Sequence, residues 1–361
     1  MTLHPVYGHD ELRARLATSM RAGRLPTALL LVGAPGVGKQ RLGLWIAAGL
    51  VCEQGPGEPC GACHGCRMAA SLMHPDIHWF FPILRPKAEE DRQAEEAEEL
   101  LAQAVQARRE QPLYPPPDGM AGIFLSLVRV LHRRALMRPA MAKRKVFVVG
   151  DAERLVPQAS SPEAANALLK VLEEPPPDTW FILTAAEPAS LLPTIRSRLV
   201  QLRVRRLRAS EVTRFLAEVP EPPLAAAEAK RRAEQAAGSI GSALAEAGEG
   251  GGAEADARAL LEAATRGNVA RFRYALGFKA SGARGDFSDL LAGAADQLRD
   301  RVARRLRHPG GAETGTGPEP AATALLEAIR EIERARKLAR GNVNPQLVVA
   351  DLTRRLGEWL A

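Results

Sequence analysis

A glycine-rich turn that ends in lysine is the first group of residues in this sequence that could do chemistry. Gly33, Gly36, Gly38, Lys39 and Gln40 follow an apolar run over 28–32 and precede a helical pattern over 40–50. In a phosphate-binding loop the glycines turn backbone N–H groups toward phosphate oxygens, and the lysine neutralises the β- and γ-phosphates. The last position ordinarily carries Ser or Thr, whose hydroxyl binds Mg²⁺. We therefore predict a phosphate-binding loop, either functional or vestigial, over the alternative of a plain strand-to-helix connection. Whether it binds ATP or ADP is left open.

Four cysteines form a second chemical group. Cys52, Cys60, Cys63 and Cys66 lie within fifteen residues and are all the cysteines of the chain. Two C-x-x-C steps that share a cysteine suit a closed, tetrahedral Zn²⁺ site with a structural role, since a four-thiolate shell leaves no position for a catalytic water. An iron–sulfur cluster, which also takes four cysteines, is the main alternative. A disulfide scaffold would spread its cysteines through the chain.

A single acid ends a predicted buried strand at VFVVGD. Asp151 stands where phosphate-loop ATPases hold Mg²⁺, and the residue after it ordinarily polarises the attacking water. Here that residue is Ala152, and we expect Glu153 to point to the other side of an extended chain. A turn residue or a helix cap is an equally good interpretation of Asp151.

The composition excludes several classes of protein. Apolar residues make up 46% and charged residues 25% of 361 residues, as in soluble globular proteins. Lys and Arg exceed Asp and Glu by 49 − 42 = 7, a mildly basic balance that is compatible with contact to nucleic acid. No apolar run approaches the roughly 18 residues of a membrane span, and no secretory signal opens the chain. We expect a cytoplasmic protein that does not bind membranes.

The elements that must position these residues alternate between strands and helices. Apolar runs of strand length at 28–32, 146–150 and 180–186 are separated by helical patterns, including 166–174. This alternation predicts an α/β domain with a mainly parallel sheet. An acidic and Pro-rich insertion over 85–118 is expected to be a solvated helix or a mobile segment. Helical patterns dominate after residue 207, with a predicted linker at 248–252 and a helix at 322–341.

The motifs, in this order, resemble a known family: the delta-prime subunits of bacterial DNA polymerase III clamp loaders, within the AAA+ superfamily. The resemblance covers nearly the whole chain except the acidic insertion. It depends on the four-cysteine segment and on GRLPTALLLVGAPGVGK (23–39), GDAERL (150–155), NALLKVLEEPP (166–176), TIRSRL (194–199), AGSIGSAL (237–244) and NVNPQLVVADLTRRL (342–356).

The resemblance implies three domains. Residues 1–205 would form an α/β AAA+ (phosphate-loop) domain in which the zinc-binding module 52–66 is an insertion. Residues 206–247 would form a small helical lid domain, and residues 255–361 an all-α collar domain for oligomerisation. A helical bundle without a partner is the alternative for the collar.

The departures from the family's motor subunits bear on hydrolysis. The motor subunits resemble this chain but carry Thr where Gln40 stands, Glu where Ala152 stands and Arg at the position that corresponds most closely to Gly241. Their sensor threonines fall on Ala185 and Ala186. Losing these groups together should remove several orders of magnitude in rate. The resemblance therefore implies a subunit without ATPase activity of its own.

One catalytic feature of the motor subunits is retained in this chain. Ser197-Arg198 matches the S-R-C motif, with Leu199 in place of the Cys, and Arg198 would act as an arginine finger that stabilises charge on the γ-phosphate of a neighbouring subunit. The alternative is that Arg198 is one more basic residue in an Arg-rich segment. Spacing alone favours that plainer alternative, and the resemblance favours the finger.

The resemblance also implies the partners: the gamma/tau and delta subunits of the loader in a hetero-oligomer, and through them the sliding clamp and primer-template DNA. The function would be to help load the clamp onto primed DNA during replication. Two rival functions remain, an ATP-hydrolysing motor subunit of the gamma/tau type and a zinc-dependent nucleic-acid-binding module. The latter is disfavoured because Arg67 is the only basic residue beside the cysteines.

Overall fold

The structure is a computed structural model that describes residues 3–110, 121–155, 163–220, 223–245, 252–277, 284–307, 320–339 and 344–360. Contacts between residues divide the chain into two units, Met1–Ala247 and Gly248–Ala361. Residues 111–118 of the predicted insertion and 248–251 of the predicted linker lie outside the described residues.

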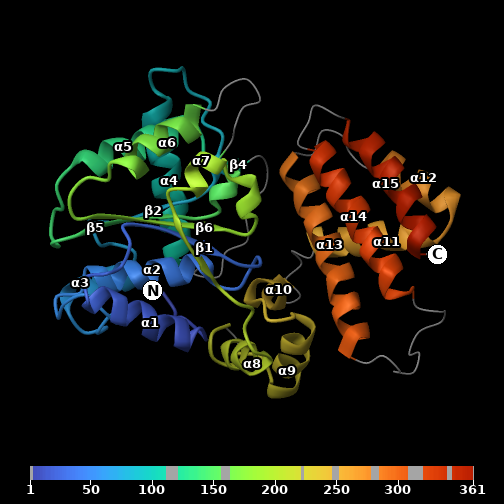
Figure 1. Ribbon diagram of the computed structural model, residues 1–361, viewed down its shortest axis with the longest axis horizontal. Coiled ribbons are helices and arrows are strands. Elements are labelled where there is room, and N and C mark those ends of the chain that lie inside the picture. Colours follow the sequence, from blue (N-terminus) through green and yellow to red (C-terminus); the bar gives the residue numbers. More distant parts are fainter. Residues whose placement is uncertain are drawn as a thin grey trace. The chain divides into compact units, whose positions relative to one another are not determined.

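A parallel sheet of five strands forms the centre of the N-terminal unit (Figure 1). Its order is β2-β5-β6-β1-β7, and every neighbouring pair is parallel. The strands are β1 (Ala28–Val32), β2 (Ile77–Phe80), β5 (Lys145–Val149), β6 (Thr179–Ala185) and β7 (Val200–Arg203). The predicted α/β class and mainly parallel sheet are thus confirmed. Because Val32 pairs with Ala185, β1 and β6 end at the same edge of the sheet.

Helices cover both faces of the sheet, which explains why its central strands are buried and mostly apolar. On one face lie α1 (Asp10–Arg21), α2 (Lys39–Leu50) and α3 (His64–Ala70), and on the other lie α5 (Leu125–Leu136) and α6 (Glu163–Glu173) (Figure 1). Residues 29–31 of β1 and 146–149 of β5 are all buried. The helix α2 that opens from β1 packs on four of the five strands, so the residues at its start have a fixed place over the sheet.

The acidic insertion contains a helix that is only partly solvated. Helix α4 (Gln93–Glu110) packs on α5 and follows β3 (Ile83–Leu84), which pairs antiparallel with β4 (Ala121–Gly122). Ala97 and Leu101 are buried, and Glu98 pairs with Arg133 and Arg134 of α5. The expected helix is therefore present, but one of its faces belongs to the core.

Three helices after the sheet form a small core of their own inside the N-terminal unit. A short helix α7 (Pro193–Arg196) precedes β7, and α8 (Ala209–Glu218), α9 (Ala226–Gln235) and α10 (Ile240–Ala245) follow it. Val212 and Leu216 of α8 pack with Ala229 and Ala233 of α9, and the Tyr7 ring lies edge-on to Phe215 at 5.2 Å. The boundaries predicted for a separate lid domain remain a prediction.

The described part of the C-terminal unit is helical. It contains α11 (Gly252–Thr265), α12 (Asn268–Gly277), α13 (Arg284–Arg307), α14 (Ala322–Ala339) and α15 (Pro345–Leu360). Its core includes Leu298 of α13, together with Leu325 and Ile332 from the predicted helix at 322–341. Residues 248–251 of the predicted linker and the helix end at Gly341 lie outside the described residues, while Gly252 begins α11.

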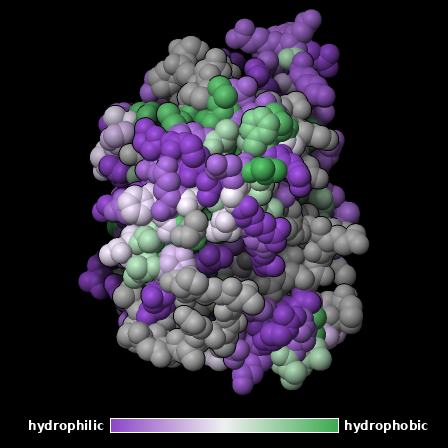
Figure 2. Space-filling model, turned by 90° about the vertical axis from the view of Figure 1, so that its right-hand side faces the viewer, coloured by the Kyte–Doolittle hydropathy of each residue, from purple (hydrophilic) through white to green (hydrophobic). Residues whose placement is uncertain are grey.

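Helix α12 exposes apolar side chains in a row. Val269, Phe272 and Leu276 are each more than 60% exposed, and their spacing puts them on one face of the helix. Figure 2, which looks onto the C-terminal unit, shows hydrophobic side chains gathered among hydrophilic ones. Such exposed apolar surface is typical of sites that bind other proteins.

None of the helices in the described ranges is both long and apolar enough to cross a membrane.

Candidate functional site

The glycine-rich loop connects β1 to α2 at the edge where β1 and β6 end. The backbone N–H of Gly33 donates to the Ala185 carbonyl at 3.2 Å, which ties the start of the loop to the end of β6. Gly36 (φ 71°) and Gly38 (φ 89°) adopt the left-handed conformation that favours glycine, and Gly38 immediately precedes α2. The loop therefore has the backbone expected of a phosphate-binding turn at a helix N-terminus.

Lys39 lies inside the loop. Its side chain is buried, and its ammonium donates to the Ala34 carbonyl at 2.9 Å. Burial lowers the pKa of Lys39, while the nearby carboxylates of Asp151 and Glu153 act in the opposite direction. A negatively charged ligand would relieve the cost of burying this cation.

Gln40 occupies the place where the hydroxyl for Mg²⁺ is expected, and both ends of its amide are bonded. Its Nε2 donates to Asp151 Oδ2 at 2.9 Å, and its Oε1 accepts from Trp79 Nε1 at 3.0 Å. We call these three side chains the Gln40 clasp. Gly150 borders the clasp so closely that a Cβ there would lie 2.4 Å from Gln40. The Asp151 carboxylate thus accepts a hydrogen bond from an amide at the position where the carboxylate of an ATPase would bind Mg²⁺.

The chain after Asp151 does not run extended, and this corrects one expectation. Asp151 has φ 50° and leads into a short 3₁₀ helix (Ala152–Arg154), so Glu153 stays at the same edge of the sheet. Glu153 accepts from the backbone N–H of Ala186 at 2.7 Å, and burial together with Asp151 raises its pKa. Ala152 is fully buried, and Asp151 caps no helix with its side chain.

The segment before α10 lies directly on the loop. Ser239 is buried and donates through its hydroxyl to the Pro35 carbonyl at 3.1 Å. The backbone N–H of Gly241 donates to the Gly36 carbonyl at 3.2 Å, and a Cβ on Gly241 would lie 2.9 Å from the Gly36 Cα. The position compared with the sensor arginine of motor subunits is thus in backbone contact with the loop.

The four predicted cysteine ligands come together after α2. Their sulfur atoms all lie within 4.8 Å of one another, and those of Cys60 and Cys66 are 3.9 Å apart. Four sulfurs bound tetrahedrally at about 2.3 Å from a zinc ion would lie roughly 3.8 Å apart. The cysteines can therefore hold one metal ion.

Backbone N–H groups point at these sulfurs. Cys63 N donates to Cys60 Sγ at 3.4 Å, and Cys66 N donates to Cys63 Sγ at 3.3 Å, where Cys63 caps α3. The bond from Cys63 and a further one from Ala62 lower the pKa of Cys60 to about 6. Such bonds favour the thiolate, which is the form that binds metal. Burial raises the pKa of Cys66, a cost that a bound cation would offset.

Arg198 follows α7 and is exposed. Its guanidinium donates to the Thr194 carbonyl at 2.7 Å and to the Ser197 hydroxyl at 3.5 Å, and it pairs with Glu173 at the end of α6. Ile195 and Leu199 on either side of it are buried. The backbone that carries Arg198 is therefore anchored in the core while its side chain faces outward.

Several contacts at the loop had no signal in the sequence. The structure brings Trp79 from β2 to Gln40, and Arg108 of α4 lies over the rings of Phe81 and Trp79, 3.1 and 4.6 Å from their centres. Pairing of β2 with β5 makes these contacts possible, and β2 was not predicted. For Ser239, the AGSIGSAL motif was a signal, but it did not identify which residue bonds the loop.

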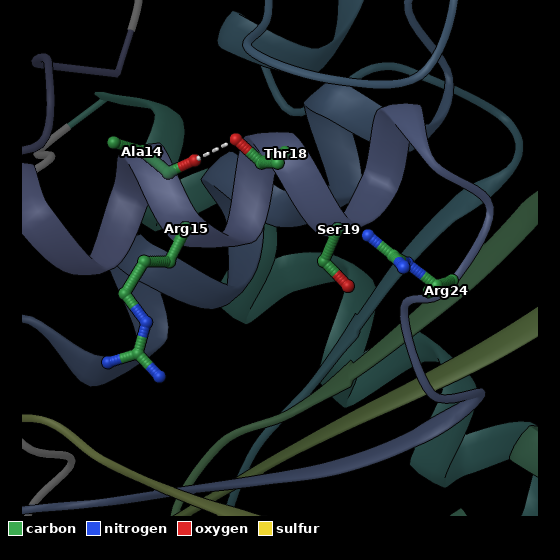
Figure 3. A pocket seen from close by; sticks show the side chains of 5 residues that line it. All are labelled: Ala14, Arg15, Thr18, Ser19 and Arg24. Atoms are coloured by element: carbon green, nitrogen blue, oxygen red, sulfur yellow. Dashed lines mark hydrogen bonds between the residues drawn. The ribbon is translucent and has the colours of Figure 1, made fainter.

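A surface depression of about 410 Å³ lies elsewhere, over α1 (Figure 3). Ala14, Arg15, Thr18, Ser19 and Arg24 line it, and the Thr18 hydroxyl donates to the Ala14 carbonyl within the helix. None of these residues belongs to the predicted site.

Comparison with known proteins gives one family and several relatives. A sequence model of the family described as "DNA polymerase III, delta subunit" matches residues 8–208. The chain is 34% identical over 177 residues to the DNA polymerase III subunit delta' of Yersinia pestis, a match that covers 49% of this chain and 41% of that protein. The chain is also 32% identical over 185 residues to the DNA polymerase III subunit delta' of Escherichia coli K12, a match that covers 51% of this chain and 44% of that protein.

The chain is also similar to a gamma/tau subunit of DNA polymerase III. The DNA polymerase III subunit gamma/tau of Mycobacterium tuberculosis H37Rv is 30% identical over 194 residues, which cover 54% of this chain and 27% of that protein. The chain spans less than half the length of each of these three relatives.

Proposed function

Since the chain belongs to the family described as DNA polymerase III, delta subunit, whose model matches more than half of its 361 residues, we propose that it acts as the delta-prime subunit of the clamp loader. In this function it helps to load the sliding clamp onto primed DNA, together with gamma/tau and delta subunits. The similarity to two proteins named DNA polymerase III subunit delta' supports this assignment.

The proposed subunit does not hydrolyse ATP, and the Gln40 clasp is the observation that carries this proposal. An Mg²⁺ ion at the loop would compete with Gln40 Nε2 for the Asp151 carboxylate, and the amide offers no hydroxyl in exchange. Ala152 has no carboxylate to polarise water, and Gly241 has no cationic side chain. Nucleotide binding without turnover remains compatible with the intact glycines and the buried Lys39.

Arg198 is the residue that we propose to act on a nucleotide. As an arginine finger it would stabilise charge on the γ-phosphate in the site of a neighbouring subunit. Its exposure and its backbone, which is anchored between the buried Ile195 and Leu199, support this role, because a planar cation that crosses an interface must be both accessible and fixed.

The metal that we propose for the cysteine module is one structural Zn²⁺ ion. Four thiolates complete the tetrahedral shell and leave no open position for catalysis. An iron–sulfur cluster places iron atoms between its ligands and separates the thiolates further, so the short distances between the sulfurs favour a single ion. The ion would fix the loop between α2 and α3.

The helical parts are proposed to serve assembly. The helices α8 to α10 would be the lid over the loop, supported by the bonds of Ser239 and Gly241 to it. The C-terminal helices would be the collar that joins the subunits, supported by the exposed apolar row on α12. Primer-template DNA would be a partner of the whole complex.

A motor subunit of the same loader is the second candidate, since a gamma/tau subunit is 30% identical over about half of this chain. The two candidates differ in whether this chain hydrolyses ATP itself or only its neighbouring subunits do.

The test measures steady-state ATP turnover by the loader reconstituted with gamma/tau-type and delta subunits, primed DNA and clamp. We expect Arg198→Ala to lower the turnover of the complex, because loss of an arginine finger removes transition-state stabilisation worth orders of magnitude at the site that it serves. Sites served by other residues would set the remaining rate.

The chain alone, with Mg²⁺, is the control and should be silent. Turnover by the isolated chain, with no effect of Arg198→Ala in the complex, would instead establish the motor candidate.

A further inference from the structure

The side chain of Arg198 is held by contacts of two kinds. Thr194 and Ser197 belong to the same helical turn as Arg198, so their bonds move with it. Glu173 belongs to α6 and lies 25 residues earlier in the chain. Among the described residues, the Glu173 carboxylate is thus the contact that ties the guanidinium to a different element.

The end of α6 is a firm support for that carboxylate. Leu168, Val171 and Leu172 of α6 are buried in the same core as Ile195 and Leu199, which flank Arg198. Helix α6 packs on both α5 and α7. Glu173 is the last residue of the helix and is followed closely by Pro175, which cannot continue the helix. The backbones that carry Glu173 and Arg198 are therefore fixed relative to one another.

The pair is too exposed to matter much for folding. The side chains of Arg198 and Glu173 are 35% and 45% exposed, and an ion pair between such groups adds little to stability. The pairing does limit the directions in which the guanidinium can point. Reactions that depend on a placed group are sensitive to errors of about 1 Å.

We propose that Glu173 is a positioning residue for Arg198, a role that rests on the proposed arginine finger. The Glu173 carboxylate bonds one edge of the Arg198 guanidinium. This bond restricts the Arg198 side chain to one orientation at the surface of the subunit. The five N–H groups of an arginine outnumber the three acceptors seen here, so the γ-phosphate of the neighbour can be bound while Glu173 stays paired.

The test uses the reconstituted complex with primed DNA and clamp, and measures kcat and KM for ATP. We expect Glu173→Ala to lower kcat roughly 2- to 5-fold, the value of an exposed charge pair, with KM unchanged because the finger acts in the transition state. Glu173→Gln keeps an acceptor of the same shape and should lie between the wild type and Glu173→Ala. Glu174→Ala, one residue further on, is the matched control and should leave kcat unchanged.

A double variant separates positioning from a general structural effect. If Glu173 acts through Arg198, then Glu173→Ala adds no further loss once Arg198→Ala is present. A further loss in the double variant, a wild-type kcat in Glu173→Ala, or a higher kcat would each overturn the inference, the last by showing that Glu173 holds the finger back. If Arg198→Ala itself has no effect, the arginine finger is wrong and the role of Glu173 falls with it.

Discussion

At the scale of single residues, the Gln40 clasp is the feature in which this loop departs most from the phosphate-loop pattern, which ordinarily carries Ser or Thr at that position. Gln40 fits only because position 150 has no side chain, and its amide is held at both ends by Asp151 and Trp79. The loop and the end of β5 therefore depend on one another through this side chain.

We predict that Gly150→Ala lowers the free energy of unfolding of the N-terminal unit by about 1–3 kcal/mol, the usual cost of overpacking. The new Cβ would force Gln40 out of its two hydrogen bonds. Chemical denaturation checks the value. In a Gln40→Ala background the same change should cost clearly less, because no amide stands in the way, and an equal cost in both backgrounds would contradict this explanation.

Motifs identified the loop, Asp151, the cysteines and Arg198 from the sequence, because each belongs to a short pattern with a chemical reason. Their partners could not be found in this way. Trp79, Ser239 and Glu173 act through contacts between elements that are distant in the chain, and the local sequence says nothing about such contacts. The expected direction of Glu153 was wrong because the turn at Asp151 follows from its left-handed backbone, which an apolar run before it does not reveal.

At the scale of elements, the buried strands were predictable and the edge strands were not. β1, β5 and β6 are covered on both faces and are therefore mostly apolar, with Lys145, Thr179 and Thr184 as buried polar exceptions. β7 lies at one edge with its residues largely exposed, and the four residues of β2 at the other edge include His78. Each is only four residues long, too short for its pattern to stand out in the sequence, so pairing with β1 or β5 defines it.

The cysteine module is an element whose fold we expect to depend on metal. We predict one zinc ion per chain and no acid-labile sulfide by elemental analysis. Removal of the metal with a chelator, or Cys63→Ser, should lower the Tm of the N-terminal unit, because the loop before α3 loses its central cross-link. His64→Ala is the matched control, since His64 is exposed beside Cys63 and is not needed to complete four ligands. Iron with sulfide, or a full stability without metal, would refute the zinc assignment.

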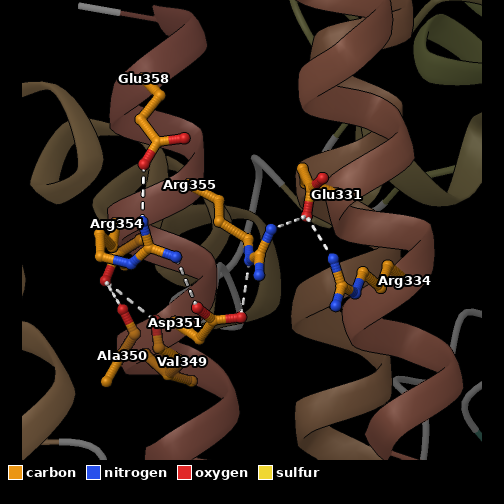
Figure 4. Close-up of polar contacts among 9 residues, drawn as sticks. Glu331, Arg334, Val349, Ala350, Asp351, Arg354, Arg355 and Glu358 are labelled. Atoms are coloured by element: carbon orange, nitrogen blue, oxygen red, sulfur yellow. Dashed lines mark hydrogen bonds and ion pairs between the residues drawn. The ribbon is translucent and has the colours of Figure 1, made fainter.

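At the scale of the whole molecule, the two units have separate cores and different ionisable groups. In the N-terminal unit, burial, with Arg134 and Lys145 adding to it, lowers the pKa of His78 from 6.5 to about 4, and its ring stacks on Phe147 at 4.7 Å. In the C-terminal unit, Arg355 and Arg354 hold Asp351 in the network of Figure 4. Burial opposes these bonds, which nevertheless keep the pKa of Asp351 below 3.8.

We predict two unfolding transitions that respond to acid in different ranges. As the pH falls, His78 takes up its proton at a higher pH in the unfolded chain than in the folded chain. The N-terminal unit therefore loses stability as the pH falls from 6.5 to about 4, by roughly 3 kcal/mol at most. The Asp351 pairing is intact above 3.8 and is lost only below it. Calorimetry at a pH above 6.5 and at a pH near 4 measures both transitions.

His78→Phe keeps a ring against Phe147 and removes the titrating group, so the acid sensitivity of the N-terminal transition should shrink in this variant. The variant keeps its cysteines, which separates this effect from any loss of metal. An undiminished sensitivity would show that His78 is not its source.

The contact between Gly36 and Gly241 also bears on how such a chain can evolve. Backbone meets backbone there, and any side chain at 241 would begin 2.9 Å from the Cα of Gly36. An arginine introduced at 241 by a single mutation would push the loop away before it could serve any nucleotide. A cationic side chain at this position therefore requires the loop or Gly36 to change in the same step, so position 241 and the loop can vary only together.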